Sequence, residues 1–145
     1  MTKNKKVCNT TPVSIGKIDF KSTTEARVYK ALKSMGMNPK YEPTTFTIWK
    51  GFYPSVPYFT KDNGGNLTSD SQKIRDIHYT PDFIFKYKDY TVIVEVKGFV
   101  NDVFPYKFKL FKKYLETHNK GGKVILAMLF SKKMAVQLVD YLKTL

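Results

Sequence analysis

Cysteine, histidine and long apolar runs are scarce in this chain. The single cysteine, Cys8, cannot form an internal disulfide or a cysteine-based zinc site, which is typical of a protein from a reducing cytoplasm. Two histidines argue against a histidine-based metal cluster. The longest apolar run, residues 124–130, is far too short to cross a bilayer, and no apolar segment follows the basic N-terminus as it would in a signal peptide. We therefore expect a cytoplasmic protein with no membrane partner.

Acidic residues are also scarce. Twelve of them face 25 lysines and arginines, which leaves a net charge of +13. Such a surplus on one domain indicates a polyanionic partner, although a charge that serves only solubility is the alternative. No basic amphipathic helix dominates the chain, so a nucleic acid is favoured over a membrane surface. The 145 residues are 42% apolar and 15% aromatic, which predicts a packed globule rather than disorder.

The residue pattern predicts one α/β (α+β) domain. Residues 1–20 are rich in lysine and lack periodicity, so we expect a flexible basic arm there and a single domain over residues 21–145. Residues 54–71 hold prolines, glycines and asparagines, which indicates a long loop or a ragged hairpin. The expected elements, in αβββαβα order, are helix 22–36, strands 41–49, 77–87 and 90–97, helix 102–119, strand 123–130 and a helix from residue 131. This order predicts a mixed central sheet flanked by helices.

Two acids and a lysine stand on the apolar strands 77–87 and 90–97. Side chains alternate along a strand, so Glu95 and Lys97 share a face, and antiparallel pairing through a short turn would bring Asp82 near Glu95. Neighbouring buried carboxylates raise each other's proton affinity, and a divalent cation removes that repulsion. Mg²⁺ prefers oxygen ligands and uses only one or two carboxylates. We therefore predict a Mg²⁺ site formed by Asp82, Glu95 and the backbone carbonyl of Val96.

Lys97 and Glu25 are the other candidate catalytic residues. A lysine next to the metal can hold the attacking water or the scissile phosphate and stabilise the negative charge of the transition state. Glu25 occupies the third position of a capping box that begins at Ser22, so it is either a helix cap or a carboxylate that reaches a second metal directly or through a water. We favour the second role because Glu25 lies on the inward face of its helix.

Four lysines are candidate DNA contacts. Lys107 and Lys109 lie beside the apolar stripe of the helix expected at 102–119, where they could enter the cleft and hold a phosphate, unless they only solvate that helix. Lys50 and Lys61 are interleaved with aromatic residues between 49 and 58. Those rings could stack on unpaired bases or could anchor the core and the loop.

These motifs together resemble the PD-(D/E)xK nuclease superfamily. Within it, the chain looks like small bacteriophage endonucleases that are akin to the phage endonuclease I type of Holliday junction resolvase. The resemblance covers roughly residues 21–130 and is weakest in the loop 54–71. It depends on Glu25 in its Ser-x-x-Glu helix start, Tyr41-Glu42-Pro43, Thr80-Pro81-Asp82-Phe83 and Glu95-Val96-Lys97-Gly98.

The resemblance implies a restriction-endonuclease-like core and Mg²⁺-dependent hydrolysis of DNA phosphodiesters, with Mn²⁺ able to substitute and no small-molecule cofactor. It implies Asp82 and Glu95 as metal ligands, Lys97 as the catalytic lysine and Glu25 as the outer acid. It also implies a homodimer, because resolution of a four-way junction takes two symmetric cuts.

The sequence therefore predicts a DNA endonuclease, and no recognition helix of a sequence-specific binder stands out. For that reason we expect structure-selective cutting of branched DNA in phage recombination or replication. One alternative is a restriction, nicking or transposition-type cut in ordinary duplex. A second is a DNA-binding module that kept the fold and lost the reaction. A third, a purely structural protein, fits the charge poorly.

Overall fold

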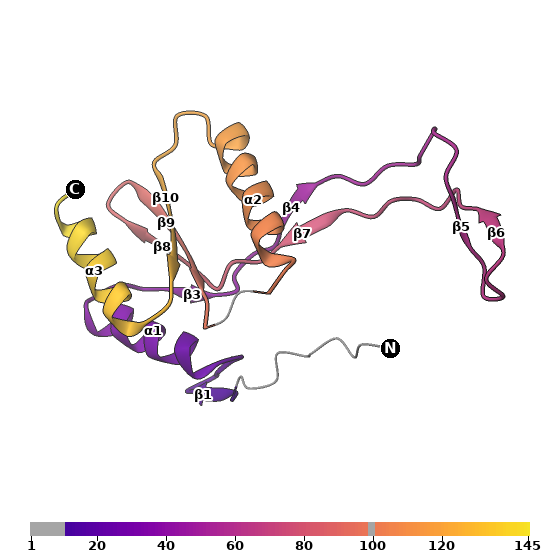
Figure 1. The fold of residues 1–145 in the computed structure, drawn as a ribbon. Helices are drawn as coiled ribbons and strands as arrows, with labels where there is room; N and C mark the ends of the chain where they lie inside the picture. Colours follow the sequence, from indigo (N-terminus) through magenta and orange to yellow (C-terminus); the bar gives the residue numbers. More distant parts are fainter. Residues whose placement is uncertain (1–10, 99–100) are drawn as a thin grey trace.

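The computed structural model describes residues 11–98 and 101–145, and it shows a mixed α+β protein (Figure 1). Four strands form the central sheet in the order β10 (Val124–Leu129), β9 (Tyr90–Val96), β8 (Phe83–Tyr87) and β3 (Lys40–Tyr41). The pair β9–β10 is parallel and the other two pairs are antiparallel, which confirms the expected mixed sheet. Three helices accompany it: α1 (Thr23–Ser34), α2 (Phe104–His118) and α3 (Lys132–Lys143).

The connections follow from the strand directions. β8 and β9 form a hairpin across a two-residue turn in which Lys88 has a positive φ of 48°. Parallel strands need a longer crossover, and α2 supplies it between β9 and β10. β10 lies at the edge of the sheet, yet both of its faces are covered as its continuous apolar sequence predicts, since its alternate residues pack into two different cores.

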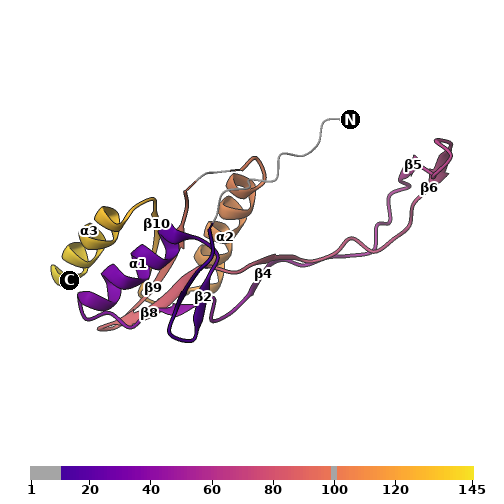
Figure 2. The ribbon, with the colours of Figure 1, turned by 90° about the horizontal axis from the view of Figure 1, so that it is seen from below.

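The two faces of the sheet carry different helices, with α1 and α3 on one side and α2 on the other (Figures 1 and 2). Val92, Val94 and Val96 belong to the core beneath α1 and α3. Ile93 belongs instead to the core that contains Phe111 of α2. Because side chains alternate along β9, Glu95 projects to the same face as Ile93. Glu95 therefore lies on the α2 side of the sheet, whereas Glu25 belongs to α1 on the other side (Figure 1).

Helix ends agree with the expected capping residues in two of three cases. The Ser22 hydroxyl accepts the N–H of Glu25, and the Ser131 hydroxyl accepts the N–H of Met134. In α2 the capping position is Val103, which makes no side-chain cap, and Asn101 instead accepts the N–H of Phe104. The helix expected over residues 102–119 thus begins two residues later, at Phe104.

Two predicted strands are divided in the structure. Strand 77–87 separates into β7 (Ile77–Tyr79) and β8, because Pro81 has no N–H to donate to a ladder. Strand 41–49 separates into β3 and β4 (Phe46–Trp49). β4 pairs with β7 rather than with the central sheet.

The segment between β4 and β7 is a long hairpin that extends away from the rest of the molecule (Figure 1). Its tip is formed by β5 (Phe59–Lys61) paired with β6 (Leu67–Ser69). Of the two alternatives for residues 54–71, the ragged hairpin is thus confirmed.

The expectation of a loose arm over residues 1–20 is wrong for residues 11–20. Those residues form a hairpin of β1 (Val13–Ile15) and β2 (Ile18–Phe20), with Gly16 at a φ of 60° in the turn. Apolar residues alternate on both sides of Gly16, a pattern that favours a hairpin. Burial of Phe20 against Tyr41 and Phe83 then holds this hairpin on the core. The expectation for residues 1–10 lies outside the described residues.

Membrane insertion has no candidate helix in the part of the chain that the structure describes. None of the three helices has both the length and the apolar character that a bilayer crossing requires.

Candidate functional site

Asp82 and Glu95 lie together at one end of the β8–β9 hairpin. Phe83 pairs with Val94 in the antiparallel register, so one further step places Asp82 opposite Glu95. Both side chains face the α2 side of the sheet, and only 8% of Asp82 and 4% of Glu95 is exposed. The expected antiparallel pairing is confirmed, and it produces two neighbouring buried carboxyl groups.

Asp82 is held by the backbone of the neighbouring strand. Its Oδ2 accepts the N–H of Val96 at 2.6 Å. Burial above all, together with the negative charge of Glu95, raises the pKa of Asp82 to about 8, while the Val96 N–H and the charge of Lys97 oppose the shift. Without a cation, the Asp82 carboxyl group therefore holds a proton at neutral pH.

Glu95 has a partner on each of its oxygens. Its Oε1 lies 2.6 Å from Nζ of Lys97, and its Oε2 accepts the Tyr79 hydroxyl at 2.7 Å. Burial and the negative charge of Glu95 both raise the pKa of Tyr79, so this phenol stays a hydrogen-bond donor. Each carboxylate oxygen has two lone pairs, which leaves one on each oxygen after these contacts.

Tyr79 was not among the residues singled out from the sequence. Its position on strand 77–87, three residues before Asp82, is the available signal, because a buried tyrosine hydroxyl usually needs a polar partner.

Lys97 bridges Glu95 and the first residue of α2. Its Nζ lies 4.1 Å from the centre of the Phe104 ring, in cation–π geometry. About a quarter of the Lys97 side chain is exposed, so the ammonium group is at the edge of the site and within reach of solvent. Phe104 was expected only as part of an apolar stripe, and its contact with Lys97 is a tertiary feature that helical spacing does not reveal.

Glu25 is buried at the start of α1 and is bound by several protein donors. The Ser22 hydroxyl donates to Oε1, while the Lys21 N–H and the Tyr41 hydroxyl donate to Oε2. The Ser22 cap of α1 is therefore formed, but the Glu25 carboxylate accepts the N–H of Lys21, one residue before the Ser22 N–H that a capping box uses. The charge of Glu25 is also close enough to Asp82 to raise the pKa of that carboxyl group. Its role as outer acid stays a prediction.

A metal-binding group of three or more His, Cys, Asp or Glu side chains is absent from residues 11–98 and 101–145. The structure thus offers a two-carboxylate site made by Asp82 and Glu95, with Glu25 set apart. At Val96 the structure shows the N–H bound to Asp82, and its carbonyl as a ligand stays a prediction.

The four candidate DNA-binding lysines do not form one cluster. Lys107 and Lys109 are exposed in the first half of α2, the half that begins beside Lys97. Lys50 is exposed at the base of the long hairpin, whereas Lys61 belongs to β5 at its far end (Figure 1). Lys61 therefore lies far from the carboxyl pair.

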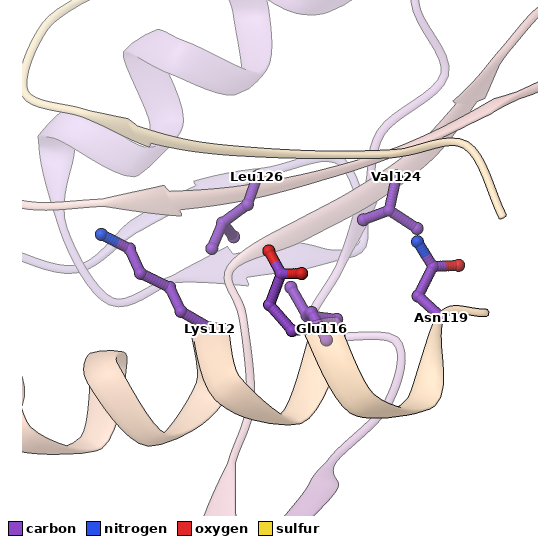
Figure 3. A pocket seen from close by; sticks show the side chains of 6 residues that line it. Lys112, Glu116, Asn119, Val124 and Leu126 are labelled. Carbon is purple, nitrogen blue, oxygen red and sulfur yellow. The ribbon is translucent and has the colours of Figure 1, made fainter. Parts of the chain in front are cut away.

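A hollow of about 350 Å³ lies elsewhere, between the second half of α2 and β10. Val124 at its wall pairs with Thr91, near the start of β9, whereas Glu95 is near the end of that strand. Figure 3 shows side chains of α2 and β10 around this hollow. It is thus at the opposite end of the sheet from the carboxyl pair. Its lining residues are Lys112, Leu115, Glu116, Asn119, Val124 and Leu126.

Comparison with known proteins gave one family. Residues 5–132 match the model described as protein of unknown function (DUF1064). The chain belongs to the DUF1064 family. The DUF1064 match contains Glu25, Asp82, Glu95 and Lys97, and it ends at the start of α3. Neither the curated proteins nor the solved structures gave a match to this chain.

Proposed function

We propose that this protein is a Mg²⁺-dependent DNA endonuclease with a restriction-endonuclease-like core. One observation carries the proposal: Asp82 and Glu95 are buried side by side, with the ammonium group of Lys97 beside them. Burying two carboxyl groups beside a single lysine costs stability, because burial and mutual repulsion raise the pKa of Asp82 so that it holds a proton. A functional role, rather than a structural one, accounts for such a pair.

The donor set fits Mg²⁺. Carboxylate oxygens are the ligands that this ion prefers, and it uses one or two of them while it keeps several waters for a phosphate to replace. Asp82 and Glu95 would hold the ion, which supplies Lewis-acid polarisation of a phosphodiester oxygen when bound. Mn²⁺ has similar ligand preferences and is expected to substitute.

The protein's own residues supply orientation and charge. Val96 fixes one oxygen of Asp82, and Tyr79 fixes one oxygen of Glu95. Lys97, held between Glu95 and the Phe104 ring, presents a positive charge at the mouth of the site. From there it can neutralise the phosphate in the transition state.

DNA is the proposed partner because the chain carries a net charge of +13. A positive surface binds the phosphate backbone without reading sequence. Lys107 and Lys109 on α2 follow Phe104 on the same helix and are the proposed phosphate contacts nearest to the site. We propose branched DNA as the substrate, cut by a homodimer in phage recombination or replication; a restriction, nicking or transposition-type cut in ordinary duplex is the alternative.

A second candidate function has an observation of its own. Glu95 is already bound on both oxygens, and the described part of the chain assembles no three-residue metal group. This favours a DNA-binding module of the same fold that does not cut.

A cleavage assay decides between these functions. Purified protein is incubated with a synthetic four-way junction and with linear duplex of the same sequence, in Mg²⁺, Mn²⁺ or EDTA. We expect metal-dependent cutting of the junction that Asp82→Ala and Glu95→Ala abolish while DNA binding survives. Asp140→Ala, which removes an exposed acid on α3, is the matched control and is expected to cut normally. If the wild type cuts no DNA, the binding module is correct; if linear duplex is cut as fast, structure selectivity fails.

A further inference from the structure

A cluster of basic side chains surrounds a hollow on the face of the sheet that carries α1 and α3. The hollow, of about 230 Å³, lies between these two helices and is lined by Arg27, Lys30, Ala31, Ser34 and Lys132. Four of these residues share one face of α1 at helical spacing, and Lys132 is the first residue of α3. Ala31 is buried, whereas the three cationic residues are exposed. We call this hollow and its three cations the basic notch.

The basic notch continues along α1. A neighbouring hollow of about 170 Å³ shares Arg27 and Lys30 with it and extends to Thr23 and Val13. Among the described residues, no carboxylate lines either hollow, and none of the three cations of the notch forms an ion pair. Three uncompensated positive charges around one hollow attract an anion, and a phosphate group is the anion that lysine and arginine commonly bind.

Lys132 occupies a position at which a positive charge is unfavourable for the fold. The first turn of a helix carries a partial positive charge, so acidic residues stabilise it and lysines do not. The first turn of α1 follows this rule with Glu25, whereas the first turn of α3 has no acid and begins with Lys132 and Lys133. Helix stability therefore does not account for these lysines, but binding of an anion beside them does.

The strand register places the α3 side of the notch at the same end of the sheet as the carboxyl pair. Leu129 at the end of β10 pairs with Val96, and its carbonyl accepts the N–H of Lys97 at 2.9 Å. Lys132 follows Leu129 by three residues. Lys97 and Lys132 thus leave the same edge of the sheet, Lys97 toward α2 and Lys132 with α3 on the other face (Figures 1 and 2).

The α1 side of the notch is tied to the same end of the sheet. The carboxylate of Glu25 accepts the hydroxyl of Tyr41, and Tyr41 pairs with Phe83, the residue that follows Asp82. Arg27 comes two positions after Glu25 and is exposed where Glu25 is buried, so it lies on the outer side of α1. The notch and the carboxyl pair therefore lie on opposite faces of one sheet edge.

We propose that the basic notch binds a phosphate of the DNA backbone, with Arg27, Lys30 and Lys132 as its contacts. This inference rests on the proposed function, because it takes DNA as the partner of the carboxyl pair. A duplex is straight over the size of this protein, since its persistence length is about 150 base pairs. One straight duplex does not follow both faces of a sheet edge, whereas two arms of a branched molecule can. The notch is therefore a contact for a second arm of branched DNA.

Fluorescence anisotropy of a labelled four-way junction tests the proposal, with the full chain in EDTA so that no cleavage occurs. Affinity is measured between about 50 and about 200 mM salt, because each phosphate contact adds about 0.9 to the slope of log affinity against log salt concentration. The notch variant, Arg27→Ala with Lys30→Ala and Lys132→Ala, is expected to lower this slope by about 2–3 and to weaken junction binding on the order of tenfold or more. Linear duplex of the same sequence should lose less affinity.

The matched control removes the same number of positive charges elsewhere. It combines Lys86→Ala, Lys120→Ala and Lys143→Ala, three exposed lysines. Lys86 pairs with Thr91 near the start of β9, Lys120 precedes β10, and Lys143 is at the far end of α3. These positions are away from the edge that carries the notch, so the control is expected to keep the wild-type slope. Circular dichroism checks that both variants fold.

The other outcomes overturn the proposal. Equal slopes for the notch variant and the control would mean that only net charge matters, and a notch variant with the wild-type slope has no phosphate contact there. Equal losses on junction and linear duplex would reject a second arm at the notch. A chain that binds DNA through the notch in EDTA but never cuts in Mg²⁺ overturns the proposed nuclease alone, whereas a chain that binds no DNA at low salt overturns the notch as well.

Discussion

The hydroxyl of Tyr79 donates to Oε2 of Glu95 at 2.7 Å, from a strand that is not part of the central sheet. Lys97 binds the other oxygen of the same carboxylate. Glu95 is therefore oriented from two sides before any cation or phosphate arrives. Such orientation by neighbouring hydrogen bonds is what a metal-binding carboxylate requires.

Tyr79→Phe is expected to slow junction cleavage about tenfold while leaving DNA affinity unchanged, because loss of one hydrogen bond to a charged group is worth about 1.5–3 kcal/mol. The Mg²⁺ concentration for half-maximal rate should rise as well, since Glu95 is less well oriented. Both are read from single-turnover cleavage across a Mg²⁺ titration. Tyr29→Phe, at a half-buried tyrosine of α1, is the control. An unchanged Mg²⁺ titration in Tyr79→Phe would show that Tyr79 has only a packing role.

Phe104→Leu is expected to lower the cleavage rate several-fold without unfolding the protein. Leucine keeps an apolar side chain at the start of α2 but removes the aromatic face below Lys97, a contact worth about 0.5–2 kcal/mol. Phe104→Tyr retains that face and should restore the rate. If leucine and tyrosine variants cut equally fast, Phe104 does not position Lys97.

The metal-free protein is expected to become less stable as the pH rises from about 4 to about 8. Burial raises the pKa of Asp82 from 3.8 to about 8, so the folded state binds more protons than the unfolded state in this window. The free energy of unfolding should therefore fall with pH, by about 2–5 kcal/mol at most across the window. Urea unfolding in EDTA at pH 5.5 and 8.5 measures the change.

Asp82→Asn is the matched variant for the pH effect, because an amide can still accept the Val96 N–H but does not ionise. Its unfolding free energy should change less with pH than that of the wild type. Addition of Mg²⁺ should stabilise the wild type more at pH 8.5 than at pH 5.5, since the ion favours the charged carboxylate. If the unfolding free energies of wild type and variant change equally with pH, ionisation of Asp82 is not the cause of the pH effect.

Glu25 can be tested for its two roles separately. Ser22→Ala removes the cap of α1 and is expected to cost about 1 kcal/mol of stability, measured by urea unfolding. Glu25→Gln keeps a side-chain oxygen for the Lys21 and Tyr41 donors but removes the negative charge. If Glu25 is the outer acid, Glu25→Gln lowers the cleavage rate at least tenfold while Ser22→Ala cuts normally at 25 °C. Normal cleavage by Glu25→Gln would restrict Glu25 to its capping role.

Local sequence signals predicted the elements whose stabilising contacts are local. The Ser22 and Ser131 caps and the turn of the β8–β9 hairpin each depend on residues that are close in the chain. The Gly16 turn is equally local, but the expectation of a loose arm over residues 1–20 does not predict it. The errors in strand boundaries arise where the two halves of one predicted strand pair in different sheets. Strands 41–49 and 77–87 were each expected as one piece, yet each is shared between the central sheet and the long hairpin.

The residues of the candidate site also fall into two groups, those that the strand pattern predicts and those that it does not. Asp82, Glu95 and Lys97 were predictable because alternation along two paired strands relates them directly, and the register of β8 and β9 places Asp82 opposite Glu95. Tyr79 and Phe104 were not predictable as neighbours of that pair. Each comes from an element that packs on the α2 face of the sheet, and packing depends on three-dimensional contacts rather than on sequence spacing.

By itself, the sequence determined the charge of this protein, its helix caps, its apolar alternation and therefore which side chains share a face of each strand. Only the tertiary structure decided that Tyr79 and Phe104 orient Glu95 and Lys97, that Glu25 is bound by Tyr41, and that residues 50–76 project as an uncovered arm. The physical reason is that caps and turns are formed within a few residues of chain, whereas the contacts of Tyr79 with Glu95 and of Tyr41 with Glu25 each join residues 16 positions apart, which only the folded packing brings together.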